Sequence, residues 1–112
     1  MKKSAIQFPD FDKLEMRVGE VKDAKIVETS KKLYELFVDL GEEYGQVTIL
    51  TGMRAYYQPE DYIGKKFLFL ANLAPKPMAG KISQGMILSG DIEGKPILIE
   101  VPNSLNNGLL IR

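Results

Sequence analysis

The apolar residues of this chain fall in short segments separated by turn signals, and this spacing constrains the fold more than any other feature. Each segment alternates with period two or is apolar throughout, as β-strands are, and Gly, Asn, Asp or Pro residues follow it. The expected strands are residues 16–27, 36–40, 46–51, 67–71, 86–88, 96–101 and 109–111. About five to seven short strands with one or two short helices favour a small, nearly closed β-barrel, and a two-sheet sandwich is the alternative.

Three of these segments carry finer predictions. In residues 16–27 the apolar residues change faces at Gly19, which predicts a β-bulge or a sharp bend at that glycine. The turn Gly41–Gly45 lies between two alternating segments, so residues 33–51 are expected to form a hairpin. Phe67–Ala71 is apolar at every position and is therefore expected to be covered on both faces.

Composition excludes several kinds of active site. The chain has 112 residues, the size of one domain, and its 45% hydrophobic content suffices for a core. It contains no Cys and no His, which removes disulfides, thiol catalysis and any Ser-His-Asp arrangement. The acidic pairs Glu42-Glu43 and Glu60-Asp61 suit a turn and a helix start better than a metal site, so we expect no catalytic residue, metal or cofactor. No segment approaches the roughly 20 apolar residues of a membrane span, and we expect a cytoplasmic protein.

A purely cationic segment runs from Tyr62 to Gly90. It contains no Asp or Glu, although the chain as a whole has 15 acidic residues and a net charge of zero. Its lysines are Lys65, Lys66, Lys76 and Lys81. The central part, residues 71–86, is rich in Pro, Gly and small polar residues and is predicted to be a loop between two apolar segments. A basic loop on a rigid framework is typical of an anion site, and polyanions are the commonest large anions.

Several residues in and near this segment allow two interpretations. Asn72 either fixes a turn by bonding backbone groups or presents its amide beside Lys76, and the two roles are compatible. The pair Lys31-Lys32 either lies in a solvated turn or extends the cationic surface. Tyr34 either stacks on a base or packs against the barrel, and packing is the favoured interpretation. Residues 80–85 match neither a phosphate-binding loop nor a nucleophile elbow.

Some stretches of the chain resemble a known family. The matching landmarks are Phe11–Gly19, Val38–Gly41, Tyr57–Glu60, Gly64–Lys66 and the most specific pair, Ala71–Lys76 with Ser83–Met86. Together they make residues 8 to 112 similar to the tRNA-binding domain family. Its members are appended to methionyl-tRNA synthetases, to one chain of bacterial phenylalanyl-tRNA synthetase and to an endothelial cytokine precursor, and they also occur as small free-standing dimers.

The resemblance implies an architecture. It is an all-β fold, a five-stranded oligonucleotide-binding (OB) barrel with short helices and a C-terminal β extension. Residues 1–112 would then be a single domain. Within it, residues 1–10 would be an N-terminal lead, and residues from about 90 to 112 an extension that pairs two chains.

The resemblance also implies a function. The family binds the outer corner of the tRNA L by shape, with little sequence preference, and does no chemistry of its own. We therefore expect a non-catalytic tRNA-binding homodimer that acts as or with an accessory module of methionyl-tRNA synthetase and has no membrane partner. A chaperone-like or protein-interaction module on the same fold is the alternative, although the chaperone branch lacks the Ser-x-Gly-Met pattern found at Ser83–Met86.

The expected RNA face combines motif positions with the charge argument. Its residues are Lys32, Asn72, Lys76, Lys81, Ser83 and Met86. The chain departs from the family pattern at two places. Pro77 follows Lys76 where the family often has a second basic residue, and residues 28–33 lack the His, Pro and Asp of the family's first hairpin.

Overall fold

The structure is a computed structural model that describes residues 1–112, and almost all of its regular structure is β-strand. Two short helical turns are the exceptions. The elements in chain order are α1 (Phe8–Asp12), β1 (Met16–Ile26), β2 (Tyr34–Asp39), β3 (Gln46–Thr51), the 3-10 turn η1 (Pro59–Asp61), β4 (Lys66–Leu70), β5 (Lys76–Met78), β6 (Lys81–Ser83), β7 (Met86–Ile87), β8 (Ser89–Ile92), β9 (Lys95–Leu98), β10 (Glu100–Val101) and β11 (Leu110–Ile111). The predicted all-β class is confirmed.

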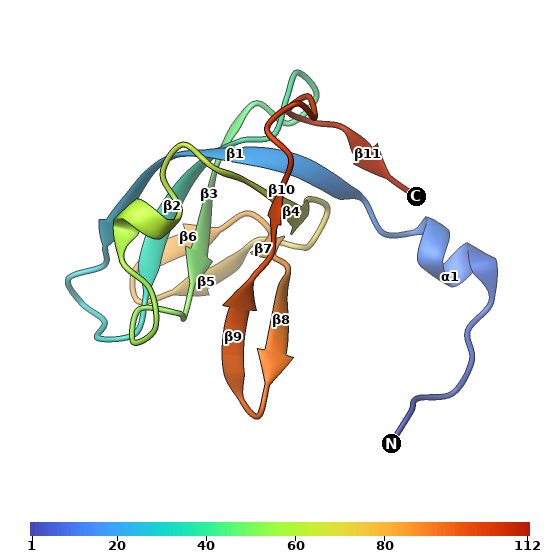
Figure 1. The fold of residues 1–112 in the computed structure, drawn as a ribbon, viewed down its shortest axis with the longest axis horizontal. Coiled ribbons are helices and arrows are strands. Elements are labelled where there is room, and N and C mark those ends of the chain that lie inside the picture. Colours follow the sequence, from blue (N-terminus) through green and yellow to red (C-terminus); the bar gives the residue numbers. More distant parts are fainter.

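One antiparallel sheet of seven strands curls into a nearly closed barrel (Figure 1). Its order is β10-β4-β1-β2-β3, with β11 added to β1 and β7 added to β4. The long strand β1 makes this curvature possible because its first half pairs with β4 and its second half with β2. The predicted hairpin is confirmed as β2 and β3, which pair over their whole length from Tyr34↔Thr51 to Asp39↔Gln46.

The predicted bulge at Gly19 is wrong in its position. The register of β1 against β2 shifts between Val21 and Asp23, so Lys22 is the extra residue. Gly19 instead serves close packing, since a Cβ atom there would lie 2.7–2.8 Å from the side chains of Val38, Leu40 and Phe69. The predicted change of faces does occur.

Fourteen buried residues form the core inside the barrel. Tyr62 lies among them with no exposed surface, and its ring meets those of Tyr34, Tyr57 and Phe67 at centroid distances of 5.9–6.3 Å. Burial raises the pKa of the Tyr62 hydroxyl above the ordinary tyrosine value. Each large side chain enclosed in this way contributes about 1.5–3 kcal/mol through its transfer from water.

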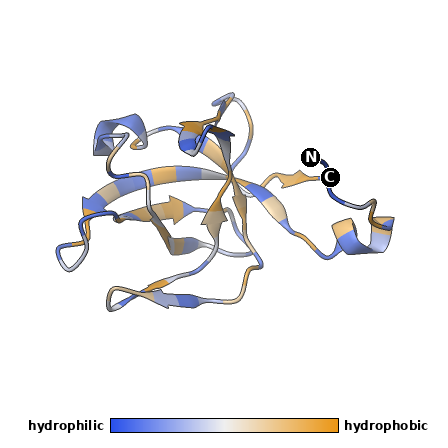
Figure 2. Cartoon of the chain, turned by 90° about the horizontal axis from the view of Figure 1, so that it is seen from below, coloured by the Kyte–Doolittle hydropathy of each residue, from blue (hydrophilic) through white to orange (hydrophobic).

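The C-terminal segment pairs with the first half of β1 along the edge opposite β4. Val18 is fully buried but does not belong to the core cluster, and its backbone bonds to residues 108 and 109. Gly108 N donates to Val18 O at 2.7 Å, and Val18 N donates to Leu109 O at 3.0 Å. Along β1, hydrophilic and hydrophobic bands alternate (Figure 2). The first half of β1 thus has a hydrogen-bonded neighbour at each edge, β4 at one and the C-terminal segment at the other.

Other segments differ in detail from the expected strands. In Phe67–Ala71 the odd-numbered residues are buried and Leu68 and Leu70 are half-buried, so only one face is fully covered. The expected strand 96–101 is interrupted at Ile99. Its first part pairs with β8 in a hairpin that extends away from the barrel (Figure 1).

No helix of the chain has the length and apolar character needed to span a membrane.

Candidate nucleic-acid interface

The predicted loop 71–86 contains a small hairpin, β5–β6, in which Lys76 pairs with Ser83 and Met78 with Lys81. This hairpin lies against the outer edge of β3, and the residues that follow β6 close the barrel there. Gln84 N donates to Thr48 O at 2.8 Å, while Thr48 N donates to Gln84 Oε1 at 3.0 Å. A side chain therefore takes the place of a neighbouring strand in satisfying the edge of β3.

Ser83 completes this closure. Its residue surface is 4% exposed, its hydroxyl accepts a bond of 3.0 Å from Leu50 N, and it donates a bond of 2.9 Å to Gly85 O. A hydroxyl that is buried and bonded in this way has no exposed group for an RNA molecule. In this geometry Ser83 positions the hairpin, and its expected contact with RNA stays a prediction.

Gly85 makes the turn that follows. Its φ of +140° lies in a region that L side chains rarely adopt, and a Cβ atom there would lie 2.8 Å from Leu70 O. The backbone passes so close to β4 that only glycine fits. Ser83 and Gly85 together fix the place at which Met86 emerges, 43% exposed.

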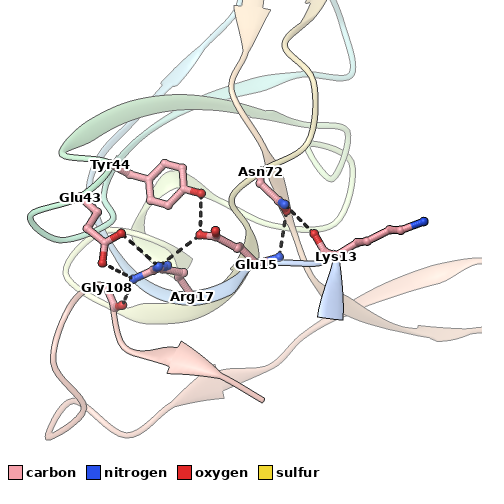
Figure 3. Close-up of polar contacts among 7 residues, drawn as sticks. All are labelled: Lys13, Glu15, Arg17, Glu43, Tyr44, Asn72 and Gly108. Carbon is pink, nitrogen blue, oxygen red and sulfur yellow. Dashed lines mark hydrogen bonds and ion pairs between the residues drawn. The ribbon is translucent and has the colours of Figure 1, made fainter. Parts of the chain in front are cut away.

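Asn72 binds the backbone that leads into β1 (Figure 3). Its Oδ1 accepts a bond of 2.9 Å from Glu15 N, and its Nδ2 donates a bond of 2.7 Å to Lys13 O. Ala71 N donates to Glu15 O at 2.8 Å beside them. Of the two roles expected for Asn72, the structure contains the backbone-fixing one, although the residue remains exposed.

An apolar hollow of about 180 Å³ opens on one side of the hairpin. Its lining residues are Leu50, Leu73, Ala74, Lys76, Met78, Ser83, Gly85 and Met86. Lys76 is the single charged residue among them, and it is exposed and forms no ion pair. The structure thus brings Lys76 and Met86, two residues of the expected RNA face, to one site.

A polar hollow of about 430 Å³ opens between the hairpin and the end of β1. Its lining residues are Lys25, Ile26, Val27, Glu28, Thr29, Glu35, Ala79, Gly80 and Lys81. Here Lys81 Nζ lies 3.6 Å from Glu35 Oε1, so a carboxylate offsets part of its charge. Thr29 Oγ1 donates to Ala79 O at 2.8 Å and ties the loop between β1 and β2 to the tip of the hairpin.

Lys32 lies in that loop, exposed to solvent. Arg54 holds the backbone of this loop, because Arg54 N donates to Lys32 O at 3.3 Å and Arg54 Nη1 donates to Ser30 O at 2.6 Å. Tyr34 is 3% exposed and its hydroxyl donates to Tyr57 O at 2.7 Å, so it packs in the core and its ring has no free face for a base.

A polar network that the sequence did not predict lies where the start of β1, the turn after β2 and the C-terminal segment meet (Figure 3). Arg17 lies between Glu15 and Glu43 at 3.2 and 3.5 Å, and it donates to Gly108 O at 3.0 Å. The Tyr44 hydroxyl donates to Glu15 Oε2 at 2.6 Å. This bond lowers the pKa of Glu15 below its ordinary value, with a further contribution from Arg17. The same bond raises the pKa of Tyr44 above its ordinary value.

No signal in the local sequence indicates that network, because its members are up to 91 residues apart. It fits neither a metal site nor an acid–base pair. No group of three or more Asp or Glu residues has the geometry to hold a metal ion. The network joins β1, the turn after β2 and the C-terminal segment, and we assign it to the fold.

Comparison with known sequences gives consistent relatives. A family model described as "Putative tRNA binding domain" matches residues 16–109. Methionine–tRNA ligase of Oceanobacillus iheyensis is 45% identical over 108 residues, which are 96% of this chain and 16% of that protein. The ligase of Methanocaldococcus jannaschii is 41% identical over 112 residues, 99% of this chain and 17% of that protein. The chain spans about a sixth of the length of these relatives.

Solved structures agree with the sequence relatives. The crystal structure of a MetRS related protein from Pyrococcus horikoshii is 40% identical, with a TM-score of 0.92 over 98% of this chain and 100% of that one. The chaperone CsaA of Bacillus anthracis is 30% identical, with a TM-score of 0.85 over 97% of this chain and 100% of that one. The resemblance inferred from Ala71–Lys76 and Ser83–Met86 is confirmed, and the chain belongs to the tRNA-binding domain family.

Proposed function

We propose that this chain is a non-catalytic module that binds the outer corner of tRNA through the side of the β5–β6 hairpin. The observation that carries the proposal is Lys76, an exposed cation without an acidic partner in a segment free of Asp and Glu from Tyr62 to Gly90. A ligand with spaced phosphates is the partner that such a surface attracts. Membership in the tRNA-binding domain family supports tRNA as that ligand.

The residues of the proposed face divide into two groups. Lys32, Lys76, Lys81 and Met86 are exposed and would contact RNA. Asn72 and Ser83 bond to the backbone of other segments and would hold that face in place. Lysines suit phosphate contacts as point charges, whereas bidentate base reading in RNA or DNA favours Arg. A face of this kind would bind by shape with little sequence preference.

Methionyl-tRNA synthetase is the proposed partner in function. Two methionine–tRNA ligases are 45% and 41% identical to this chain, and the matched part is a small fraction of each. In this role the chain adds affinity for tRNA, and the catalytic part of the ligase does the chemistry. Such a module would work in the cytoplasm, where aminoacylation occurs.

We also propose a homodimer, with residues from about 90 to 112 as its pairing extension on a single domain. Large apolar side chains are exposed on the β8–β9 hairpin, at its end and on α1. They are Phe8, Ile92, Ile97 and Ile99, at 70, 60, 37 and 53% exposure. Covering them with a second copy would remove this surface from water. A monomer mass by light scattering at micromolar concentration would refute the dimer.

Salt dependence of tRNA binding tests the main proposal. If three lysines of each chain of a dimer meet phosphates, log affinity falls with log salt with a slope of roughly −4 to −5. Lys76→Ala should weaken tRNA binding about tenfold. It should also make the salt slope shallower by about 1 for each chain, because each chain loses one phosphate contact. Lys22→Ala is the matched control, because Lys22 lies on β1 with Glu20 as its ion-pair partner at 3.3 Å. An unchanged slope in Lys76→Ala would rule out the electrostatic assignment.

The apolar hollow favours a second candidate, a chaperone-like module that binds apolar peptide segments. Three of the side chains around it, Leu73, Met78 and Met86, are flexible and apolar, and the relative from Bacillus anthracis is a chaperone. Binding of an apolar peptide should be nearly insensitive to salt. A titration of tRNA and of a labelled apolar peptide at two salt concentrations separates the two candidates.

A further inference from the structure

The apolar hollow differs from the rest of the proposed RNA face because phosphate groups gain nothing from contact with apolar side chains. Leu50, Leu73, Ala74, Met78 and Met86 supply most of its lining, and Lys76 lies at the same site. A surface that met only the RNA backbone would consist of lysines and polar groups, without a recess of about 180 Å³. The recess therefore calls for an apolar part of the ligand that lies close to a phosphate.

The hollow has almost no side-chain group with which to recognise hydrogen-bonding patterns. Ser83 is its single hydroxyl, and that hydroxyl is already bonded to Leu50 N and Gly85 O. The Lys76 ammonium is the remaining polar side chain, and it can donate but not accept. A ligand in the hollow would be held by its apolar faces, whatever its donors and acceptors are.

Two methionines suit a flat aromatic ring in this position. Met78 and Met86 lie on β5 and β7 and both line the hollow. Thioether sulfur makes favourable contacts with aromatic rings, and the unbranched side chain adapts to different ring sizes. An ammonium at the same site adds attraction to the ring face or to the attached phosphate.

We propose that the apolar hollow receives one unpaired nucleobase of the bound RNA, of any identity, while Lys76 meets an adjacent phosphate. The inference rests on the proposed tRNA-binding function and adds a base contact to it. A nucleotide joins an aromatic base to a phosphate through its ribose, and the apolar and cationic parts of the site match the two together. No acid lines the hollow, as suits an anionic ligand better than a general peptide.

Abasic tRNA tests the proposal. A fluorescein-labelled tRNA transcript is compared with versions that lack the base at one unpaired corner position at a time, by fluorescence anisotropy. Removal of one particular base should weaken binding by about fivefold to tenfold, near the lower end of stacking on aromatic residues. Met86→Ala should weaken binding of intact tRNA by a similar factor and cause no further loss with that abasic tRNA. Neither change should alter the salt slope, since no charge is removed.

Ile82→Ala is the matched control, because Ile82 is 57% exposed on β6 but does not line the hollow. Thermal melting of each transcript verifies that the abasic tRNA keeps its fold. If Met86→Ala costs the same with every abasic transcript, the base assignment is wrong. It is also wrong if Met86→Ala weakens only the binding of a labelled apolar peptide. Absence of salt-dependent binding to intact tRNA would instead refute the underlying function.

Discussion

Two cations of this chain have opposite surroundings. The Arg17 side chain is 12% exposed, lies within 3.5 Å of Glu15 and Glu43 and donates to Gly108 O at 3.0 Å. Lys76 is exposed on the β5–β6 hairpin and has no ion pair. A rigid guanidinium with fixed partners stabilises the fold, whereas a flexible ammonium without partners is free for a ligand. Charge alone does not distinguish the two roles, but the surroundings of each charge do.

Lys81 lies between these extremes. It belongs to the same hairpin as Lys76, yet its ammonium is 3.6 Å from Glu35, whose side chain is 14% exposed. Phosphate must compete with that carboxylate for the same ammonium. The hairpin thus has one side that is ready for an anion and one side where binding an anion disrupts an existing contact.

The largest expected effect concerns the backbone that holds the hairpin. Gly85→Ala should lower the free energy of unfolding by about 3 kcal/mol, because it combines a strained φ with a clash against Leu70 O. Denaturant unfolding measures the loss. It should not depend on salt, since the defect is steric.

Gly52→Ala is the control for that change, because a Cβ atom there meets nothing within 4 Å. It should alter stability by less than about 0.5 kcal/mol. Equal effects of the two substitutions would contradict the role assigned to Gly85 in closing the barrel.

Arg17→Ala tests the structural side of the comparison. It removes the side-chain donor of Gly108 O and the ion-pair partner of Glu15, which keeps only Tyr44, and should cost about 2 kcal/mol of unfolding free energy. The folded Arg17→Ala variant should keep its tRNA affinity.

Lys76→Ala should give the reverse, with weaker tRNA binding and a stability change within about 0.5 kcal/mol. A loss of stability in Lys76→Ala would show that the two cations do not have separate roles.

The strands of the barrel could be predicted because their signals are local. Leu36, Val38 and Leu40 alternate with half-buried neighbours, and this period of two corresponds directly to the buried face of β2. The bulge in β1 was misplaced because the sequence shows where the apolar face changes, whereas the register shift after Val21 depends on the partner strand. The short strands β5 and β6 were missed because their hairpin is anchored by bonds from Ser83 and Gln84 to the distant strand β3.

The motif residues of the interface were easier to find than their roles. Sequence patterns singled out Asn72 and Ser83, but both bind backbone groups 33 to 59 residues away, which no local pattern reveals. Arg17, which organises the network with Glu15 and Glu43, gave no signal in the sequence for the same reason. Lys76 and Met86 could be predicted as surface residues because a loop rich in Pro and Gly tends to expose its side chains.

Removing the partner of Lys81 should make its side of the hairpin resemble the side of Lys76. Glu35→Gln frees the ammonium and should raise tRNA affinity about twofold to threefold, with a steeper salt dependence. Glu28→Gln is the matched control, because Glu28 lines the same polar hollow without an ion pair. If Glu35→Gln and Glu28→Gln raise the tRNA affinity equally, the gain comes from the change in net charge and not from Lys81.

The smallest expected effect concerns pH and the surroundings of Arg17. The Tyr44 hydroxyl is the main cause that lowers the pKa of Glu15, so Tyr44→Phe should raise that pKa toward the ordinary value of 4.5, with Arg17 still holding it lower. A lowered pKa in the folded state stabilises the protein above about pH 4.5, and this stabilisation is lost as the pH falls through the folded pKa. The wild type should therefore lose more stability than Tyr44→Phe between about pH 6 and about pH 3.

Unfolding at both pH values and an NMR titration of the Glu15 carboxyl measure the difference, with Tyr56→Phe, exposed at 52%, as control. Identical acid sensitivity in all three proteins would mean that Arg17 alone sets the charge of Glu15, which would make the contrast with Lys76 purely a matter of ion pairing.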